Sequence, residues 1–229
     1  MCFSASASFT AAGVLAPVGV VAVAMARRRD PARWLPLALT PLLFGAQQAL
    51  EGMVWLGIES SVPLHDVRLI ALAYLGFAFA LWPIWMPWIS LRLAGERAVL
   101  WQRRLMLLLL AVGGLLAALL WLPLLLNPEL INPVVHRGSI DYQMQVPGFA
   151  PVNQRLVTLI YALIVCLPLL LTPIHRLRWL AGGLALAFTI AQLAFLYAFS
   201  SVWCYFSALL SLLVIWVLQG ESPSVRPAL

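Results

Sequence analysis

The stretch that decides the fold runs from Leu105 to Leu126 and reads LMLLLLAVGGLLAALLWLPLLL. It contains no charged residue, and Arg103 and Arg104 stand directly before it. A helix of about 20 apolar residues is long enough to cross the roughly 30 Å hydrocarbon core of a bilayer. This stretch is therefore predicted to be a transmembrane helix.

The composition of the whole chain points the same way. Of its 229 residues, 63% are hydrophobic and only 10% are charged, whereas about 25% are charged in a typical soluble domain. Every one of the 14 basic residues is an arginine, so mechanisms that need a lysine Schiff base, such as retinal binding, are excluded. The chain is predicted to be an all-α, polytopic membrane protein with one transmembrane domain, residues 1–229.

Seven apolar stretches are predicted to span the membrane as a helical bundle. They are residues 8–26, 34–57, 69–89, 105–126, 156–172, 179–199 and 204–218. Only Ser200 to Trp203 separates the last two, so a tight hairpin is predicted there. Residues 127–155, with four prolines and two glycines, are predicted to form an outer loop that could act as a lid. Residues 219–229 are predicted to be a cytoplasmic tail.

The arginines predict the orientation of the bundle. With the N-terminus outside the cytoplasm and the C-terminus inside, eleven arginines lie on the cytoplasmic side and three, Arg68, Arg137 and Arg155, on the outer side. Such an excess of basic residues in cytoplasmic loops is the usual rule. The formal charge of +6 is thus an insertion signal that suits contact with membrane lipids, and no nucleic-acid partner is predicted.

One predicted span carries an acid in its interior. Glu51 follows Gln47 and Gln48, and at 100° per residue these three side chains and Trp55 fall within about 100° of one helical face. Polar groups in hydrocarbon are costly, so this face should look into the bundle and is a candidate site. We expect the Glu51 carboxyl to be partly or wholly protonated near neutral pH unless an arginine, Arg68 or Arg155, reaches it.

Other polar side chains fall at a similar depth in other predicted spans. The candidate binding residues are Glu51, Gln47, Gln48, Gln192, Tyr74, Tyr161 and Ser207. The inner halves of the spans are close to purely apolar, so a polar cavity on the outer side is predicted. The alternative is that these groups only join helices through hydrogen bonds, which contribute about 0.6 kcal/mol each in membranes.

Three interpretations of the cysteines stay open. Cys166 lies alone in mid-span and is expected to be a packing residue. Cys2 and Cys204 both fall at the outer interface, where they could pack, form a disulfide, or bind a soft metal with Glu51 or a histidine. Packing is the first expectation, and no cofactor is identified. Two histidines in outer loops do not match a ceramidase-like zinc site, and no hydrolase or phosphate-binding motif is present.

Three segments carry a resemblance to a known family. They are MCFSASASF (residues 1–9), PLLFGAQQALEGMVW (residues 41–55) and SVWCYFSA (residues 201–208). They resemble a family of uncharacterised bacterial multi-pass membrane proteins, a group of unknown function, over most of the chain. The resemblance implies a bacterial inner-membrane location and implies no activity. It singles out Cys2, Gln47, Gln48, Glu51, Trp55, Trp203 and Cys204.

Three functions remain in view from the sequence. The first is binding or transport of a small solute, ion or lipid at a polar site around Glu51. The second is a membrane-embedded enzyme acting on lipids or thiols through Glu51, Cys2 and Cys204. The third is a structural or assembly subunit. Neither the ligand nor the oligomeric state can be read from the sequence.

Overall fold

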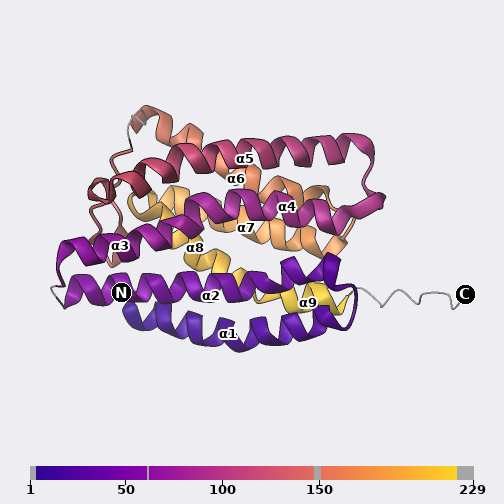
Figure 1. Ribbon diagram of the computed structural model, residues 1–229, viewed down its shortest axis with the longest axis horizontal. Helices are drawn as coiled ribbons and strands as arrows, with labels where there is room; N and C mark the ends of the chain where they lie inside the picture. Colours follow the sequence, from indigo (N-terminus) through magenta and orange to yellow (C-terminus); the bar gives the residue numbers. More distant parts are fainter. Residues whose placement is uncertain (1–3, 61, 147–150, 221–229) are drawn as a thin grey trace, which may run out of the picture.

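The helices run side by side along the long axis of an elongated bundle (Figure 1). The computed structural model describes residues 4–60, 62–146 and 151–220. Within these residues the chain makes seven helical passes of alternating direction. In chain order they are α1 (Ala5–Arg27), α2 (Pro31–Glu59), α3 (Leu64–Leu75) with η1 (Gly76–Leu81) and α4 (Trp82–Ala94), α5 (Leu100–Leu126), α6 (Pro151–Leu171), α7 (His175–Ala194), and η4 (Leu196–Ala198) with α8 (Phe199–Leu210) and α9 (Leu213–Gln219). The predicted all-α class is confirmed.

Within the part of the chain that the structure describes, five segments are long and apolar enough to cross a membrane. They are Ala5–Arg27, Leu64–Arg97, Leu100–Leu126, His175–Ala194 and Leu196–Gln219, and α6 adds a shorter apolar helix, Arg155–Leu171. Helix α2 is not among the five, because Gln47, Gln48 and Glu51 lower its hydropathy. Long apolar helices of this kind are those of a membrane protein.

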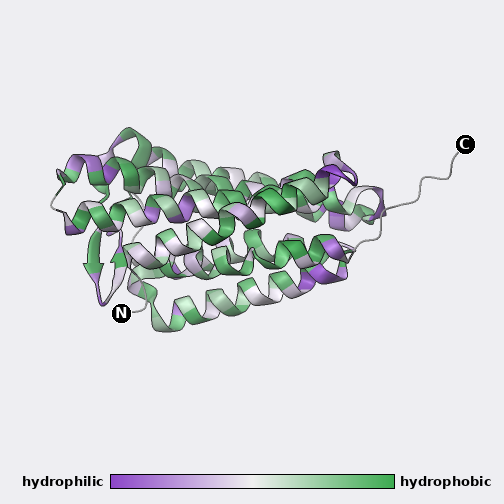
Figure 2. Ribbon diagram, turned by 90° about the horizontal axis from the view of Figure 1, so that it is seen from below, coloured by the Kyte–Doolittle hydropathy of each residue, from purple (hydrophilic) through white to green (hydrophobic). Residues whose placement is uncertain are grey.

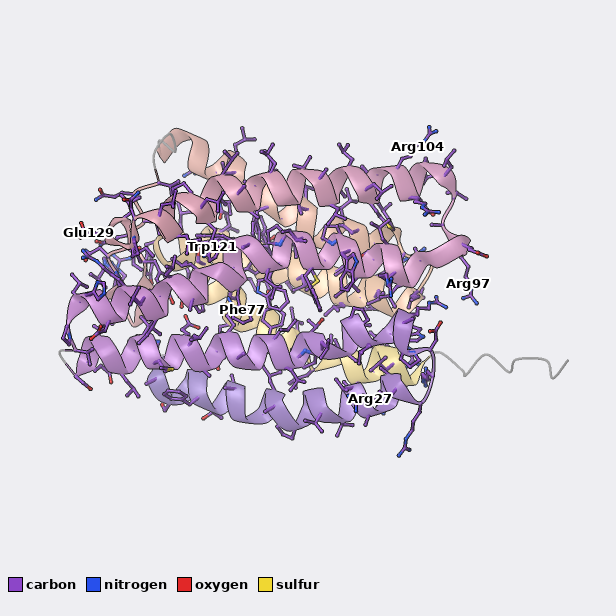
Figure 3. The ribbon with its side chains drawn as sticks, viewed as in Figure 1. Arg27, Phe77, Arg97, Arg104, Trp121 and Glu129 are labelled. Atoms are coloured by element: carbon purple, nitrogen blue, oxygen red, sulfur yellow. The ribbon has the colours of Figure 1, made fainter. Side chains whose placement is uncertain are left out.

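The two ends of the bundle differ in chemistry. Hydrophilic residues gather at both ends, while the middle is largely hydrophobic (Figure 2). Arg27, Arg97 and Arg104 lie at one end, which we call the arginine end, and Glu129 lies at the other (Figure 3). That other end carries the antiparallel strands β1 (Val134–His136) and β2 (Ser139–Asp141), and we call it the hairpin end.

Helices α1 and α2 pack closely because glycines on each helix leave room for side chains of the other. Ser4 caps α1 by accepting a hydrogen bond from the backbone N–H of Ala7 at 3.2 Å. A Cβ atom on Gly52 would lie 2.8 Å from the Phe9 ring, and one on Gly19 would lie 2.4 Å from Leu42. Close backbone approach at glycine is typical of membrane helices. This packing fixes how α2 is rotated and turns its polar face toward the rest of the bundle.

The third pass contains a π-helix that the sequence analysis did not predict. In η1 the backbone N–H of Trp82 donates to the carbonyl of Phe77, and residue 83 is a proline without an N–H. The carbonyl of Ala78 therefore receives neither of its ordinary helical donors. In an α-helix the donor would be the N–H of Trp82, and in a π-helix it would be the N–H of residue 83. The hydroxyl of Tyr161 in α6 donates to the Ala78 carbonyl instead, and this bond joins the third pass to the fifth.

The last turn of the chain lies elsewhere than predicted. The sequence placed a hairpin at Ser200 to Trp203, but these residues belong to helix α8. The chain leaves α7 at Phe195, whose φ is −134°, and the short η4 precedes α8. The prediction was wrong because the serines were taken for turn residues. They are interior polar groups of a helix, as the site shows.

The long connection between α5 and α6 folds over the hairpin end. After η3 (Pro128–Leu130) the strands β1 and β2 are joined by Arg137 and Gly138, both with positive φ, as expected for a two-residue hairpin turn. Ile131 and Ile140 are fully buried. The Arg68 Nε atom donates to the Ile131 carbonyl at 2.9 Å, which fastens the loop to α3.

Candidate functional site

Glu51 lies inside the bundle, where it joins α2 to α8. Its side chain is 1% exposed. One carboxyl oxygen accepts a hydrogen bond from the Gln48 amide at 3.1 Å, and the other accepts one from the Ser201 hydroxyl. Among the described residues, Arg68 donates to the loop carbonyl of Ile131 instead, and Arg155 is exposed. Neither of the expected counter-charges therefore pairs with Glu51.

Next to Glu51 a second group of polar side chains surrounds the Cys204 thiol. The Gln47 carbonyl oxygen accepts a hydrogen bond from the Trp82 indole N–H at 2.8 Å. The side chains of Gln47 and Tyr74 lie beside the Cys204 sulfur. The Tyr74 hydroxyl also donates to the backbone carbonyl of Ser200 at 3.2 Å. Three passes of the chain thus meet at one buried polar centre.

The loop adds Tyr142 to this centre. Its ring stacks on Tyr74, with 5.0 Å between centroids and 13° between planes. Burial, together with the nearby Glu51 carboxyl and Cys204 thiol, raises the pKa of Tyr142 well above its ordinary value, so it is a neutral phenol. Its buried hydroxyl oxygen has no hydrogen-bond partner among the described residues, and neither has the Gln48 carbonyl oxygen. Buried polar atoms are almost always paired, so these two are candidates for contact with a ligand or water.

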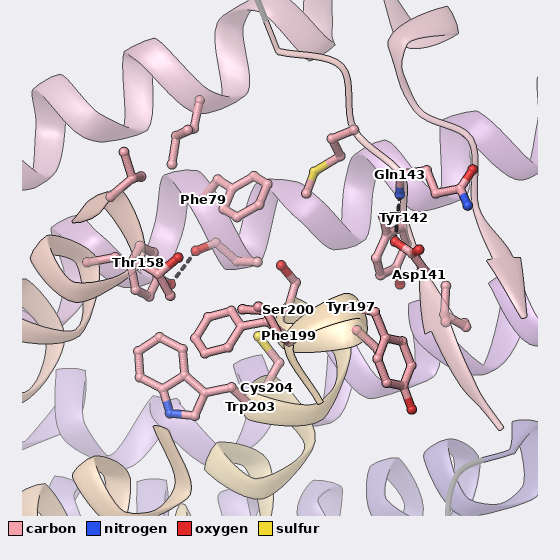
Figure 4. A pocket seen from close by; sticks show the side chains of 18 of the residues that line it. Phe79, Asp141, Tyr142, Gln143, Thr158, Tyr197, Phe199, Ser200, Trp203 and Cys204 are labelled. Atoms are coloured by element: carbon pink, nitrogen blue, oxygen red, sulfur yellow. Dashed lines mark hydrogen bonds between the residues drawn. The ribbon is translucent and has the colours of Figure 1, made fainter. Parts of the chain in front are cut away.

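A cavity of about 690 Å³ lies at the hairpin end, between the loop, η1, α5, α6 and α8. Figure 4 shows the side chains around it. Its aromatic lining consists of Phe79, Tyr142, Tyr161, Tyr197, Phe199 and Trp203. Its polar lining includes Asp141, Gln143, Thr158, Ser200 and Cys204. Cavities of roughly 300–1,000 Å³ with an apolar lining and a few polar groups are typical of small-molecule sites.

The buried polar centre forms part of the wall of this cavity. Tyr142 and Cys204 line the cavity, and the same two side chains lie close enough to Glu51 for their charges to interact. Ala78 and Phe79 of the π-helix also line it. The π-helix therefore shapes the cavity, as such helices often do at functional sites.

The structure brings together four of the seven candidate binding residues. Gln47, Gln48, Glu51 and Tyr74 belong to the buried polar centre, and Tyr161 lines the cavity itself. Ser207 lies beside a much smaller space of about 20 Å³ that it shares with Cys204. Gln192 is half-buried, and among the described residues its carbonyl oxygen has no hydrogen-bond partner.

Three contributors to the site were missed by the sequence analysis. Ser201 was assigned to a turn and Tyr142 to an undifferentiated loop, and Trp82 was not among the candidate residues. A signal existed only for Ser201: it precedes Trp203 and Cys204 in a segment that the family resemblance singled out. Nothing in the local sequence shows that Tyr142 returns to stack on Tyr74.

Two of the three cysteines lie within the described residues. Cys166 and Cys204 are free, buried thiols, and Cys2 lies outside the described residues. The Cys2–Cys204 disulfide and the shared metal therefore stay predictions. Within the described residues, no group of three or more histidine, cysteine, aspartate or glutamate side chains could hold a metal ion.

Fold and site together define a class: a helical membrane protein with a ligand-sized cavity at one end of its bundle. The chain belongs to the family of unknown function DUF6629, whose model matches residues 1–228. The predicted membership of an uncharacterised family is thereby confirmed. Comparison with curated proteins and with solved structures gave no match.

Proposed function

We propose that this protein binds a small solute or lipid in the cavity at the hairpin end, with the Glu51 centre as the polar part of the wall. The single observation that carries the proposal is the cavity itself, which combines an aromatic lining with the Tyr142 hydroxyl, a buried polar group without a partner among the described residues. A ligand with an apolar body and a hydrogen-bonding group would match both features. Such a site could serve binding alone or one step of transport.

We further propose that the chain is one transmembrane domain with seven spans in a bacterial inner membrane, its N-terminus outside and its C-terminus in the cytoplasm. The alternating passes agree with the alternating arginine counts. At the arginine end, guanidinium groups lie over tryptophan rings in the pairs Arg33–Trp34, Arg92–Trp88 and Arg176–Trp216. Arginine and tryptophan are typical of a membrane–water interface. With this orientation the cavity faces the outer side.

Binding explains the site better than thiol catalysis does. A nucleophilic cysteine needs a positive or basic neighbour that favours the thiolate. The neighbours of Cys204 are the neutral side chains of Gln47 and Tyr74 together with the acid Glu51. The described lining of the cavity contains no arginine or histidine. Cys204 is thus better suited to shape the wall than to attack a substrate.

The experiment fills the cavity by mutation and measures whether a compound still co-purifies with the protein. Val157 lines the cavity from α6, whereas Leu159, two residues on, is 49% exposed on the outside of the same helix. Protein purified in a mild detergent would be extracted, and the extract analysed by mass spectrometry. We expect a compound that is enriched with the parent and with Leu159→Trp but lost with Val157→Trp. Equal recovery from all three proteins, each eluting as a single folded species, would refute the proposal.

A further inference from the structure

The lining of the cavity has a distinctive composition. Six aromatic rings and one carboxylate, that of Asp141, face it, and the described lining has no basic side chain. The nearby His136 stacks on Tyr197, with 4.9 Å between ring centroids, but is not part of the lining. The chemistry offered to a ligand is therefore aromatic and negative.

Two of the lining aromatic side chains use their polar atoms in hydrogen bonds to the protein backbone, which leaves their rings as the surface offered to a ligand. The Trp203 indole N–H donates to the backbone carbonyl of Leu184 at 3.3 Å, and the Tyr161 hydroxyl donates to Ala78. The rings of Tyr161 and Phe199 each lie 5.2 Å from the Trp203 ring. The faces of such rings carry partial negative charge and attract cations, more strongly when water is excluded.

The negative charge of Asp141 is not neutralised by an ion pair within the described residues. Asp141 ends strand β2, and one of its carboxyl oxygens accepts the backbone N–H of Gln143 at 3.0 Å. No described arginine or histidine forms an ion pair with it. Glu51 lies near Cys204 and supplies a second carboxyl group, which also has no ion pair among the described residues.

We infer that the ligand of this cavity is an organic cation with apolar substituents, such as a quaternary ammonium compound. The inference rests on the proposed function and specifies its ligand class. Aromatic rings would enclose the apolar substituents, and Asp141 would face the charge. A phosphate or carboxylate headgroup would meet a carboxylate and no basic partner, so anionic lipids and organic anions are excluded as ligands.

The test compares two ions of the same shape and opposite charge. Tetraphenylphosphonium and tetraphenylborate have four phenyl groups each and differ in the sign of their charge. Binding of each to the purified full-length protein would be measured by equilibrium dialysis, with protein-free micelles of the same detergent as the baseline. We expect saturable binding of tetraphenylphosphonium and none of tetraphenylborate. Equal binding of both ions, or binding of neither, would overturn the inference.

Two pairs of variants locate the binding. Asp141→Asn removes the charge but keeps an oxygen for the Gln143 N–H, and we expect it to weaken tetraphenylphosphonium binding about tenfold. Glu129→Gln removes one charge from the same end outside the cavity lining, and we expect unchanged binding. Val157→Trp should abolish binding while Leu159→Trp retains it. Equal affinity in Asp141→Asn and Glu129→Gln would refute recognition of the charge by Asp141.

The same variants separate this inference from the function on which it rests. If Val157→Trp loses the co-purified compound but neither ion binds the parent protein, the cavity is a ligand site and the cationic class is wrong. If Val157→Trp retains that compound, the proposed function itself fails, whatever the two ions do.

Discussion

Gly113 offers the sharpest test of the packing that holds the cavity in shape. A Cβ atom at this position would lie 2.1 Å from the backbone carbonyl oxygen of Pro83 and 3.2 Å from a methyl carbon of Ile164. Ordinary contact begins near 3.4 Å, so Gly113→Ala forces the two helices about 1.3 Å apart, or deforms them to the same extent. The obstacle is backbone and cannot rotate away. Overpacking of a core typically costs about 1–3 kcal/mol.

Gly114 is the matched control, because a Cβ atom there meets nothing within 4 Å. Replacing a helical glycine by alanine is otherwise favourable by roughly 0.5–1 kcal/mol. We therefore expect Gly113→Ala to be destabilised by about 1 kcal/mol net, and Gly114→Ala to be as stable as the parent or slightly more so. For a chain of this size that lowers the melting temperature of Gly113→Ala by roughly 2–4 °C.

The assay is heating of the detergent-solubilised protein followed by size-exclusion chromatography with tryptophan fluorescence. Pro83 lies two residues beyond η1, whose Ala78 and Phe79 line the cavity, so Gly113→Ala should also reduce recovery of the bound compound. If Gly113→Ala and Gly114→Ala melt together, the close contact between α4 and α5 is not present and the reasoning fails.

Three further predictions concern the polar centre and the topology. Ionising the buried Glu51 is costly, so the melting temperature of the parent should fall as the pH rises from about 5 to 8, while that of Glu51→Gln should not. The same dependence of melting temperature on pH in both proteins would show that Glu51 does not titrate. Ser201→Ala leaves a Glu51 carboxyl oxygen without a donor and should destabilise the protein by about 1–3 kcal/mol, whereas Ser200→Ala should melt like the parent. An equal loss of stability in both variants would show that the bond between Ser201 and Glu51 does not join α2 to α8. Reporter fusions after Arg29 and Leu229 should both indicate the cytoplasm, and an outer signal from either would disprove the orientation.

Regular apolar helices could be predicted because their hydropathy is a local property. Helix α5 ends at Leu126, where the apolar run ends. It begins at Leu100, before the predicted start at residue 105, because Arg103 and Arg104 are compatible with a helix that extends past the membrane core. Hydropathy does not report such extensions, and the number of spans and their orientation stay predictions.

The interior polar contacts were only partly predictable, because a polar residue in an apolar chain has two common uses. It can end a helix at the membrane surface or face the centre of the bundle. The prediction from helical spacing that Gln47, Gln48 and Glu51 face inward was correct. No spacing rule connects Glu51 with Ser201, which is 150 positions away. The serine pair was therefore assigned to a turn, and the chain reverses five residues earlier, at Phe195.

The bond from Tyr161 to the Ala78 carbonyl in η1 has an evolutionary consequence. A relative with any residue other than proline at position 83 regains a backbone hydrogen that the Ala78 carbonyl can accept. The Tyr161 hydroxyl would then no longer be required to satisfy that oxygen, although the oxygen could still accept its bond. Selection should therefore keep or discard Pro83 and Tyr161 together, and an alignment of the family should show the two positions changing as a pair.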